Sequence, residues 1–129
     1  MADVNRKRKV LVVDDEPDVR TFLTTLLEDN GYETVTANTG AEALQSIRTA
    51  RPDLVTLDIT MPEQSGVRAY RDIKTDPELK NLPVVIVTGV SDDFKTFIST
   101  RGQVPPPDGF GSKPIDKAIL LELVRKLAG

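Results

Sequence analysis

The sequence contains no cysteine and no histidine among its 129 residues. Without cysteine the chain cannot form disulfides, zinc ribbons, iron–sulfur sites or thiol nucleophiles, and this composition suits a reducing compartment. Without histidine it cannot build a Ser-His-Asp triad, and it cannot carry a phosphohistidine of its own. Any chemistry must therefore use carboxylates, hydroxyls, amines and the backbone.

Aromatic residues and long apolar runs are also scarce. Tryptophan is absent and aromatic residues make up 5% of the chain, which argues against a platform that stacks nucleic-acid bases. No apolar run approaches the roughly 20 residues of a membrane span. A signal peptide has an apolar core after its basic N-terminal segment, and this sequence has none there. A net charge of −3 gives no indication that nucleic acid or an acidic lipid is the main partner. We therefore expect a cytoplasmic protein with no direct nucleic-acid or membrane partner.

The remaining composition is that of an ordinary globular domain, with 39% hydrophobic and 29% charged residues. The length favours one domain over residues 1–129. We expect residues 1–8 to form a flexible basic flank, because the run Arg6–Lys9 is short and belongs to an acidic chain. No output domain is expected.

Two kinds of segment alternate along the chain. Short β-branched segments predict strands at residues 9–15, 32–37, 53–58, 82–89 and, more weakly, 108–113. Segments with helical periodicity predict helices that begin near residues 17, 39, 65 and 91, and a fifth helix around residues 119–127. Strands that alternate with helices pair in parallel through right-handed crossovers. The sequence therefore predicts an α/β fold of the (βα)₅ type, a three-layer α/β/α sandwich.

Local signals support the first two helices. Pro17 suits a first helical turn, and Asn30-Gly31 suits a helix end. Thr39 and Glu42 have the spacing of a capping box. The first helix is expected to turn one apolar stripe toward the core, formed by Val19, Phe22, Leu23, Leu26 and Leu27.

Polar residues follow the predicted strands at their carboxyl ends, where open parallel sheets bind ligands. They are Asp14, Asp15 and Glu16 after the first strand, Asp58 after the third, Thr88 and Gly89 after the fourth, and Lys113 after the fifth. Neighbouring carboxylates repel one another, and a hard divalent cation, Mg²⁺ rather than Ca²⁺, would offset that repulsion. The acidic run alone is equally consistent with a helix cap, but Asp58 has no such explanation.

Lys113 and Thr88 allow two interpretations each. The ammonium of Lys113 could bind a phosphoryl oxygen, or it could be an ordinary solvated lysine. A β-branched residue such as Thr88 belongs in a strand in any case, and Gly89 either admits a ligand to the backbone or starts a turn.

Four motifs in chain order carry a resemblance to a known family. They are VLVVDDEPDVR, LVTLDITMPEQSG, PVVIVTG and FGSKP. Together they resemble the response-regulator receiver domains of two-component signalling, and the similarity covers essentially the whole chain. The resemblance implies a flavodoxin-like sheet with the strand order 2-1-3-4-5, an order for which the family is a known example.

The resemblance also implies a role for each site residue. Asp58 would be the phosphoacceptor, and Mg²⁺, with Mn²⁺ as an alternative ion, would be held by Asp14, Asp15, Asp58 and the backbone carbonyl of Thr60. Phosphoryl oxygens would contact Thr88, Lys113 and the backbone N–H of Gly89, and the conformational switch would be Thr88 with Phe110. Such a domain takes its phosphoryl group from a histidine kinase or phosphotransfer protein and catalyses its own phosphorylation and dephosphorylation. It signals to a downstream protein or forms a homodimer.

Two other functions fit parts of the sequence. One is a protein-interaction module that does not use phosphorylation. The other is a magnesium-dependent phosphatase of the haloacid-dehalogenase type, but that family needs a second aspartate at the position of Thr60. The segment with Pro105-Pro106-Pro107 departs from the receiver pattern, which usually has a short Ala-Gly turn here. We expect an extended loop that either sets partner specificity or acts as a rigid spacer.

Overall fold

A computed structural model describes residues 7–59, 65–88, 108–112 and 115–128. Five parallel strands form one sheet in the order β2-β1-β3-β4-β5, which confirms the predicted α/β fold and strand order. The strands are β1 (Lys9–Val13), β2 (Glu33–Ala37), β3 (Leu54–Asp58), β4 (Val84–Thr88) and β5 (Gly109–Ser112). The helices are α1 (Pro17–Asp29), α2 (Gly40–Ala50), α3 (Ser65–Thr75) and α5 (Lys117–Ala128). The helix expected after residue 91 and the three prolines lie outside the described residues.

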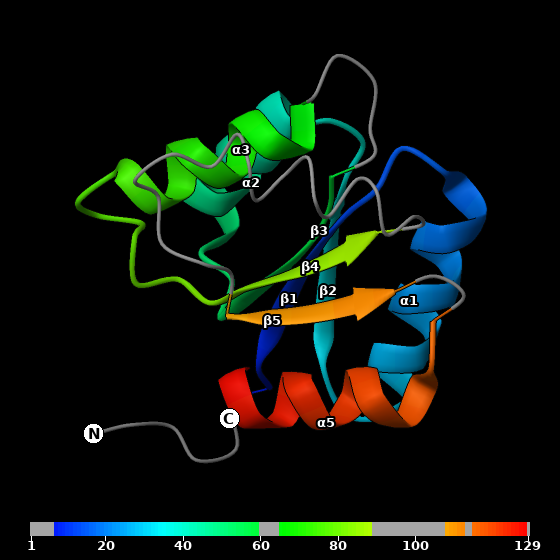
Figure 1. Ribbon diagram of the computed structural model, residues 1–129. Coiled ribbons are helices and arrows are strands. Elements are labelled where there is room, and N and C mark those ends of the chain that lie inside the picture. Colours follow the sequence, from blue (N-terminus) through cyan, green and yellow to red (C-terminus); the bar gives the residue numbers. More distant parts are fainter. Residues whose placement is uncertain (1–6, 60–64, 89–107, 113–114, 129) are drawn as a thin grey trace, which may run out of the picture.

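Helices cover both faces of the sheet, as expected for a three-layer sandwich (Figure 1). Successive strand residues point to opposite faces, so each strand contributes to two cores. On one face Leu11 and Val55 pack with α2 and α3. On the other face Val10 and Val85 pack with α1 and α5. Because both faces are buried, the central strands are apolar at nearly every position.

Helix α1 begins and ends where the sequence indicates. Pro17 is the first helical residue, Asn30 is the C-cap, and Gly31 follows with φ +91°, a value that favours glycine. The expectation that Phe22 faces the core is wrong, because its side chain is 37% exposed. The ring lies at the edge of the apolar stripe, where Nζ of Lys117 on α5 approaches its centroid to 5.6 Å. This contact is a cation–π interaction between the two helices.

Helix α2 has the predicted cap from Thr39, but the side chain of Glu42 reaches back to Asn38 rather than to the N–H of the N-cap residue itself. The Oγ1 atom of Thr39 accepts a hydrogen bond from the backbone N–H of Glu42 at 3.1 Å, and Oε1 of Glu42 accepts one from Asn38 at 3.4 Å. The helix ends at Ala50, and its C-cap residue Arg51 has the left-handed φ of 51°, a conformation for which glycine is usual. This conformation costs a residue with a side chain about 1 kcal/mol.

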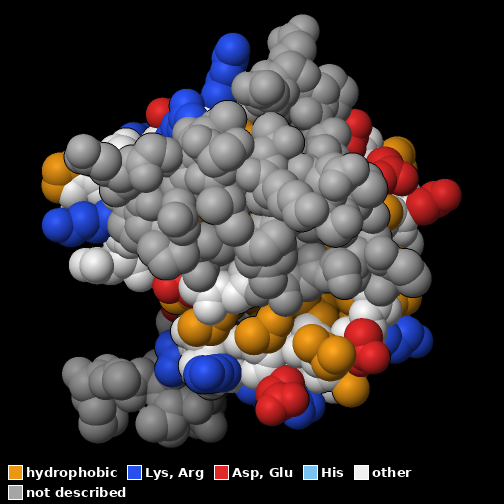
Figure 2. Space-filling model, viewed as in Figure 1, with side chains coloured by type: hydrophobic (Ala, Val, Ile, Leu, Met, Phe, Trp, Pro, Cys, Tyr) orange, Lys and Arg blue, Asp and Glu red, His pale blue; other side chains and the backbone are white. Residues whose placement is uncertain are grey.

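The α1–α5 layer carries the described large hydrophobic residues that are exposed, Phe22 and Ile119, the latter at 56%. Hydrophobic side chains lie beside charged ones along this edge of the face in Figure 2. Among the described helices none has both the length and the apolar character needed to cross a membrane.

Candidate functional site

Four carboxylates meet at the carboxyl edge of the sheet. Asp14, Asp15 and Glu16 follow β1, and Asp58 ends the adjacent strand β3. One oxygen from each of the four side chains lies within 4.8 Å of the others. The sequence predicted that Asp14, Asp15 and Asp58 would come together. It gave no role to Glu16, although the acidic run that contains this residue was the available signal.

The four side chains differ in burial. Asp14 and Asp58 are each 1% exposed, whereas Asp15 and Glu16 are exposed. Unit charges at about 5 Å repel by about 1 kcal/mol in water and by several times more in a partly desolvated site. A hard cation with oxygen ligands and retained waters relieves such repulsion, and Mg²⁺ takes a few carboxylates in this way. The donor set, four carboxylates that include two at the surface, therefore fits Mg²⁺.

The turn between β1 and α1 fixes the position of Asp14. Its Oδ1 accepts a hydrogen bond from the backbone N–H of Glu16 at 2.9 Å, and its own N–H donates to the carbonyl of Ala37 at 3.2 Å. The Nη1 atom of the half-buried Arg20 donates to the carbonyl oxygen of Asp14 at 2.7 Å. Sequence reasoning missed Arg20, because a contact with a backbone carbonyl depends on the path of the turn. The positive end of α1 also faces the carboxylates.

The N-terminus of α3 packs directly on the backbone of Asp58. A Cβ atom at Gly66 would lie 2.1 Å from the carbonyl oxygen of Asp58 and 2.8 Å from the Cα of Ile59. Only glycine permits this approach, so Gly66 helps set where Asp58 lies. In the sequence Gly66 appears only as the last residue of the motif LVTLDITMPEQSG.

The remaining predicted residues lie in neighbouring strands or directly after them. Asp58 pairs in register with Val87, and Thr88 at the end of β4 pairs with Ser112 at the end of β5. The carboxyl ends of β3, β4 and β5 are thus adjacent. Phe110 lies within β5. Thr60, Gly89 and Lys113 lie outside the described residues.

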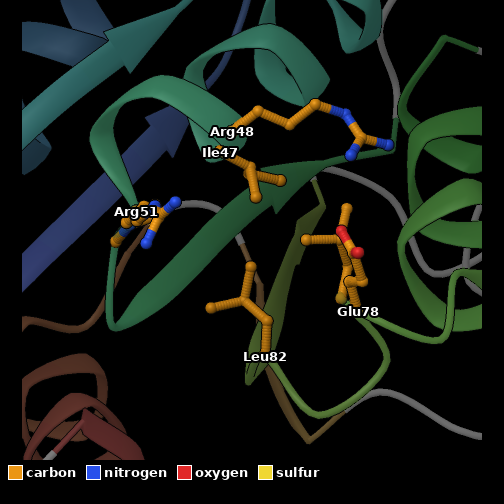
Figure 3. Close-up of a pocket in the computed structure, with 7 residues that line it drawn as sticks. Ile47, Arg48, Arg51, Glu78 and Leu82 are labelled. Atoms are coloured by element: carbon orange, nitrogen blue, oxygen red, sulfur yellow. The ribbon is translucent and has the colours of Figure 1, made fainter.

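A pocket of about 650 Å³ lies at the opposite edge of the sheet, before the first residues of β3 and β4 (Figure 3). Its lining residues come from the end of α2 and from the turn after α3: Ile47, Arg48, Arg51, Pro52, Glu78, Leu79 and Leu82. None of the predicted site residues that the structure describes lines it. The arginines and the glutamate stand around an apolar floor, and Arg48 is already paired with Asp76 at 3.0 Å. The carboxylate cluster, and not this pocket, is therefore the candidate functional site.

A family model described as the response regulator receiver domain matches residues 10–125. The chain belongs to this family. It is 40% identical over 120 residues to the CAI-1 autoinducer sensor kinase/phosphatase CqsS of Vibrio cholerae, a match that covers 92% of this chain but only 17% of that protein. It is 34% identical to protein PilH of Pseudomonas aeruginosa over 94% of this chain and 98% of PilH. The crystallised chemotaxis protein CheY4 of Vibrio cholerae superposes with a TM-score of 0.80 at 29% identity, over 95% of this chain and 99% of CheY4.

Family membership confirms the resemblance inferred from the four motifs. The chain is a phospho-accepting receiver of two-component signalling, and it signals to partner proteins. Receiver domains generally bind Mg²⁺ at an acidic cluster, and the four carboxylates form a group that could hold such an ion.

Proposed function

We propose that Asp58 is the residue that accepts the phosphoryl group. Its carboxylate stands at the carboxyl end of a central strand, with Asp14, Asp15 and Glu16 beside it. Its backbone is held by the close approach of Gly66. This convergence of four carboxylates is the observation that carries the proposal, because a helix cap requires no contribution from β3.

The proposed reaction is an in-line displacement at phosphorus. An oxygen of Asp58 forms a bond to phosphorus while the bond from phosphorus to the nitrogen of a partner's phosphohistidine breaks. The leaving imidazole belongs to the kinase or phosphotransfer protein, since this chain contains no histidine. Water later attacks the phosphorus, which releases inorganic phosphate and restores the carboxylate of Asp58.

We assign Mg²⁺ to Asp14, Asp15 and Asp58, together with the backbone carbonyl of Thr60. When bound, Mg²⁺ lowers the repulsion between the carboxylates and the incoming phosphoryl oxygens. Asp15 is exposed and is the natural direct ligand, whereas Asp14 is buried and held by the backbone N–H of Glu16. Glu16 adds a fourth carboxylate at the rim of the site.

Signalling is proposed to follow from new contacts of the phosphoryl group. Thr88, Lys113 and the N–H of Gly89 would contact its oxygens, and Thr88 and Phe110 would change position as these contacts form. Strand β4, which ends at Thr88, is adjacent to β3, and β5, which contains Phe110 and precedes Lys113, is adjacent to β4. This order of the strand ends supports the assignment. The partners would be a histidine kinase or phosphotransfer protein and a downstream protein or second copy. A chain without cysteine suits the cytoplasm.

The test uses acetyl phosphate, a small phosphodonor, with Mg²⁺. We expect a mass gain of about 80 Da for one phosphoryl group. Asp58→Asn should abolish the gain and keep the fold, because the two side chains have the same shape. Intact-protein mass spectrometry reads the gain, and circular dichroism checks the fold.

Asp53→Asn is the matched control, because Asp53 stands before the other end of the same strand. Its Oδ2 accepts a hydrogen bond from the backbone N–H of Lys9 at 2.8 Å, far from the carboxylate cluster. Asp53→Asn should be phosphorylated like the unmodified protein. If Asp58→Asn acquires an acid- and base-labile phosphoryl group at the unmodified rate, Asp58 is not the acceptor.

A further inference from the structure

A buried lysine joins three segments at the amino edge of the sheet: the end of α3, the turn that follows it, and the residue before β5. Lys74, in the last turn of α3, has a side chain that is only 5% exposed. Its Nζ donates hydrogen bonds to the carbonyls of Lys80 at 3.3 Å and Leu82 at 2.8 Å, and to Oδ2 of Asp108 at 2.9 Å. All three bonds of a lysine ammonium are thereby directed to protein oxygens.

Asp108 also holds the first residue of β4 from both sides. The same Oδ2 atom accepts a hydrogen bond from the backbone N–H of Val84 at 2.8 Å, and the N–H of Asp108 donates to the carbonyl of Val84 at 3.0 Å. Asp108 is the residue directly before β5. The pair Lys74–Asp108 therefore fixes the point at which the chain enters β5.

Strand β5 needs such an anchor more than the other strands do. It has four residues, two of which are glycines, and it stands at the edge of the sheet, where β4 is its only partner among the described strands. Glycine weakens a strand, and an edge strand has hydrogen bonds on one side alone. A slip of one residue would turn every side chain to the other face of the sheet. The local sequence of β5 does little to prevent a slip.

We propose that the Lys74–Asp108 pair is a positioning device for phosphorylation, acting through the register of β5. The strand runs from Asp108 at the amino edge to Ser112, which pairs with Thr88 at the carboxyl edge. Lys113 is the next residue in the sequence. The pair thus sets, from the far edge of the sheet, where the carboxyl end of β5 meets the end of β4. This inference rests on the proposed function of Asp58.

The experiment compares Lys74→Met with Lys9→Met in the full chain. Lys9 is a matched control, because it is a partly buried lysine at the same edge whose Nζ contacts the carbonyl of Ala50 at 3.0 Å and Glu33 at 3.5 Å. These contacts do not involve β5. Three quantities are measured for each variant: the phosphorylation rate at saturating acetyl phosphate, the rise in melting temperature caused by Mg²⁺, and amide hydrogen exchange of residues 109–112.

We expect Lys74→Met to lower the phosphorylation rate about tenfold, since small misplacements of groups at a reaction site have effects of roughly ten- to a hundredfold. Amide exchange in β5 should become faster. The response to Mg²⁺ should remain, because the carboxylates belong to β1 and β3. Lys9→Met should keep the rate. A general loosening of the fold would instead weaken Mg²⁺ binding and phosphorylation together in both variants, and that result would overturn the proposal.

Asp108→Asn and Asp108→Ala separate geometry from charge. The amide oxygen of asparagine can still accept hydrogen bonds from Lys74 and Val84, so Asp108→Asn should retain most of the rate that Asp108→Ala loses. If Lys74→Met and Asp108→Ala are phosphorylated at the unmodified rate on Asp58, the positioning role is refuted while the proposed function stands. If the unmodified protein is not phosphorylated on Asp58, the proposed function itself fails.

Discussion

Charged side chains are arranged in opposite ways at the two edges of the sheet. At the amino edge three of the described cations each contact a carboxylate: Lys74 contacts Asp108 at 2.9 Å, Lys9 contacts Glu33 at 3.5 Å, and Arg48 contacts Asp76 at 3.0 Å. At the carboxyl edge four carboxylates stand within 4.8 Å of one another. The central strands between the edges are buried and largely apolar, so they separate the two arrangements.

This difference distinguishes a surface that stabilises the fold from one that binds a ligand. Ion pairs at the amino edge join helix ends and strand beginnings to one another and need no further partner. A group of like charges lowers the stability of the folded chain until a cation binds to it. Substitutions that remove a carboxylate should therefore have opposite effects on the free energy of unfolding at the two edges.

The largest effect is expected for Gly66→Ala at the carboxyl edge. The new Cβ would lie 2.1 Å from the carbonyl oxygen of Asp58, so α3 must move away from β3. Overpacking of this kind costs roughly 1–3 kcal/mol and occasionally more, and we expect about 3 kcal/mol from chemical denaturation. The displacement of Asp58 should also slow phosphorylation.

Gly31→Ala is the control for Gly66→Ala. Gly31 has φ +91°, and apart from its chain neighbours no atom of the described residues lies within 4 Å of the place that a Cβ would take, so alanine would meet backbone strain but no clash. We expect a loss of about 1 kcal/mol and an unchanged phosphorylation rate. An equal loss in both variants would mean that the contact between Gly66 and Asp58 is not tight in solution.

The next effect concerns Mg²⁺ and Asp15. Mg²⁺ at a hundredfold excess over its dissociation constant should stabilise the unmodified protein by about 2.7 kcal/mol. Asp15→Asn should lose most of this response. Without Mg²⁺ the same variant should be more stable than the unmodified protein by about 1 kcal/mol, because one of the repelling charges is gone and salt screens the remainder.

Asp53→Asn provides the contrast from the amino edge. It weakens a hydrogen bond to the backbone N–H of Lys9, so stability without Mg²⁺ should fall while the response to Mg²⁺ persists. Thermal melts of Asp15→Asn and Asp53→Asn, each with and without Mg²⁺, measure the stability of both variants and their response to Mg²⁺. Equal melting shifts with Mg²⁺ in Asp15→Asn and the unmodified protein would contradict the assigned metal site.

Much of the fold could be predicted from the sequence because its signals are local. Apolar β-branched segments and helical periodicity identify the strands and helices, and the acidic residues that follow two strands identify the carboxylate cluster. The predicted strand ends were less accurate. The first strand was expected to reach Asp15 but ends at Val13, because the chain turns where Asp14 accepts the N–H of Glu16.

Contacts between distant residues could not be predicted in this way. Lys74 and Asp108 are 34 positions apart, and each alone resembles an ordinary residue of a helix end or a loop. The role of Gly66 depends on how closely α3 approaches β3, which no local pattern records. The apolar stripe on α1 correctly indicated the side of the helix that faces the core. It did not show that Phe22 lies at the exposed margin of that stripe.

A smaller effect is expected midway between the edges, at Thr56 of β3. Its side chain is 1% exposed, and its hydroxyl has no hydrogen-bond partner within the described parts of the chain. Thr56→Val replaces the hydroxyl with a methyl group of similar size and removes the cost of burying it. We expect stability to rise by about 1 kcal/mol in chemical denaturation.

Thr36→Val is the control for Thr56→Val, since Thr36 is exposed on β2 and its hydroxyl reaches water. It should change stability by less than about 0.5 kcal/mol. A loss of stability in Thr56→Val would mean that the hydroxyl has a partner in solution, such as an internal water.

The smallest effect concerns Asp76 at the amino edge and depends on pH. The backbone N–H of Glu78 and then the guanidinium of Arg48 lower the pKa of Asp76 from its ordinary value of 3.8. Since the pKa is lower in the folded chain than in the unfolded chain, protonation favours unfolding. The contribution of Asp76 to stability is therefore complete above the ordinary pKa and is lost as the pH falls through the lowered pKa.

Arg48→Gln should reduce stability at pH 7, and the difference from the unmodified protein should shrink below pH 3.8. Glu78→Gln retains the backbone N–H, so the contribution of Asp76 should persist in that variant. Denaturation midpoints measured from pH 7 downward test this, and a difference for Arg48→Gln that stays constant with pH would show that its ion pair with Asp76 does not form in solution.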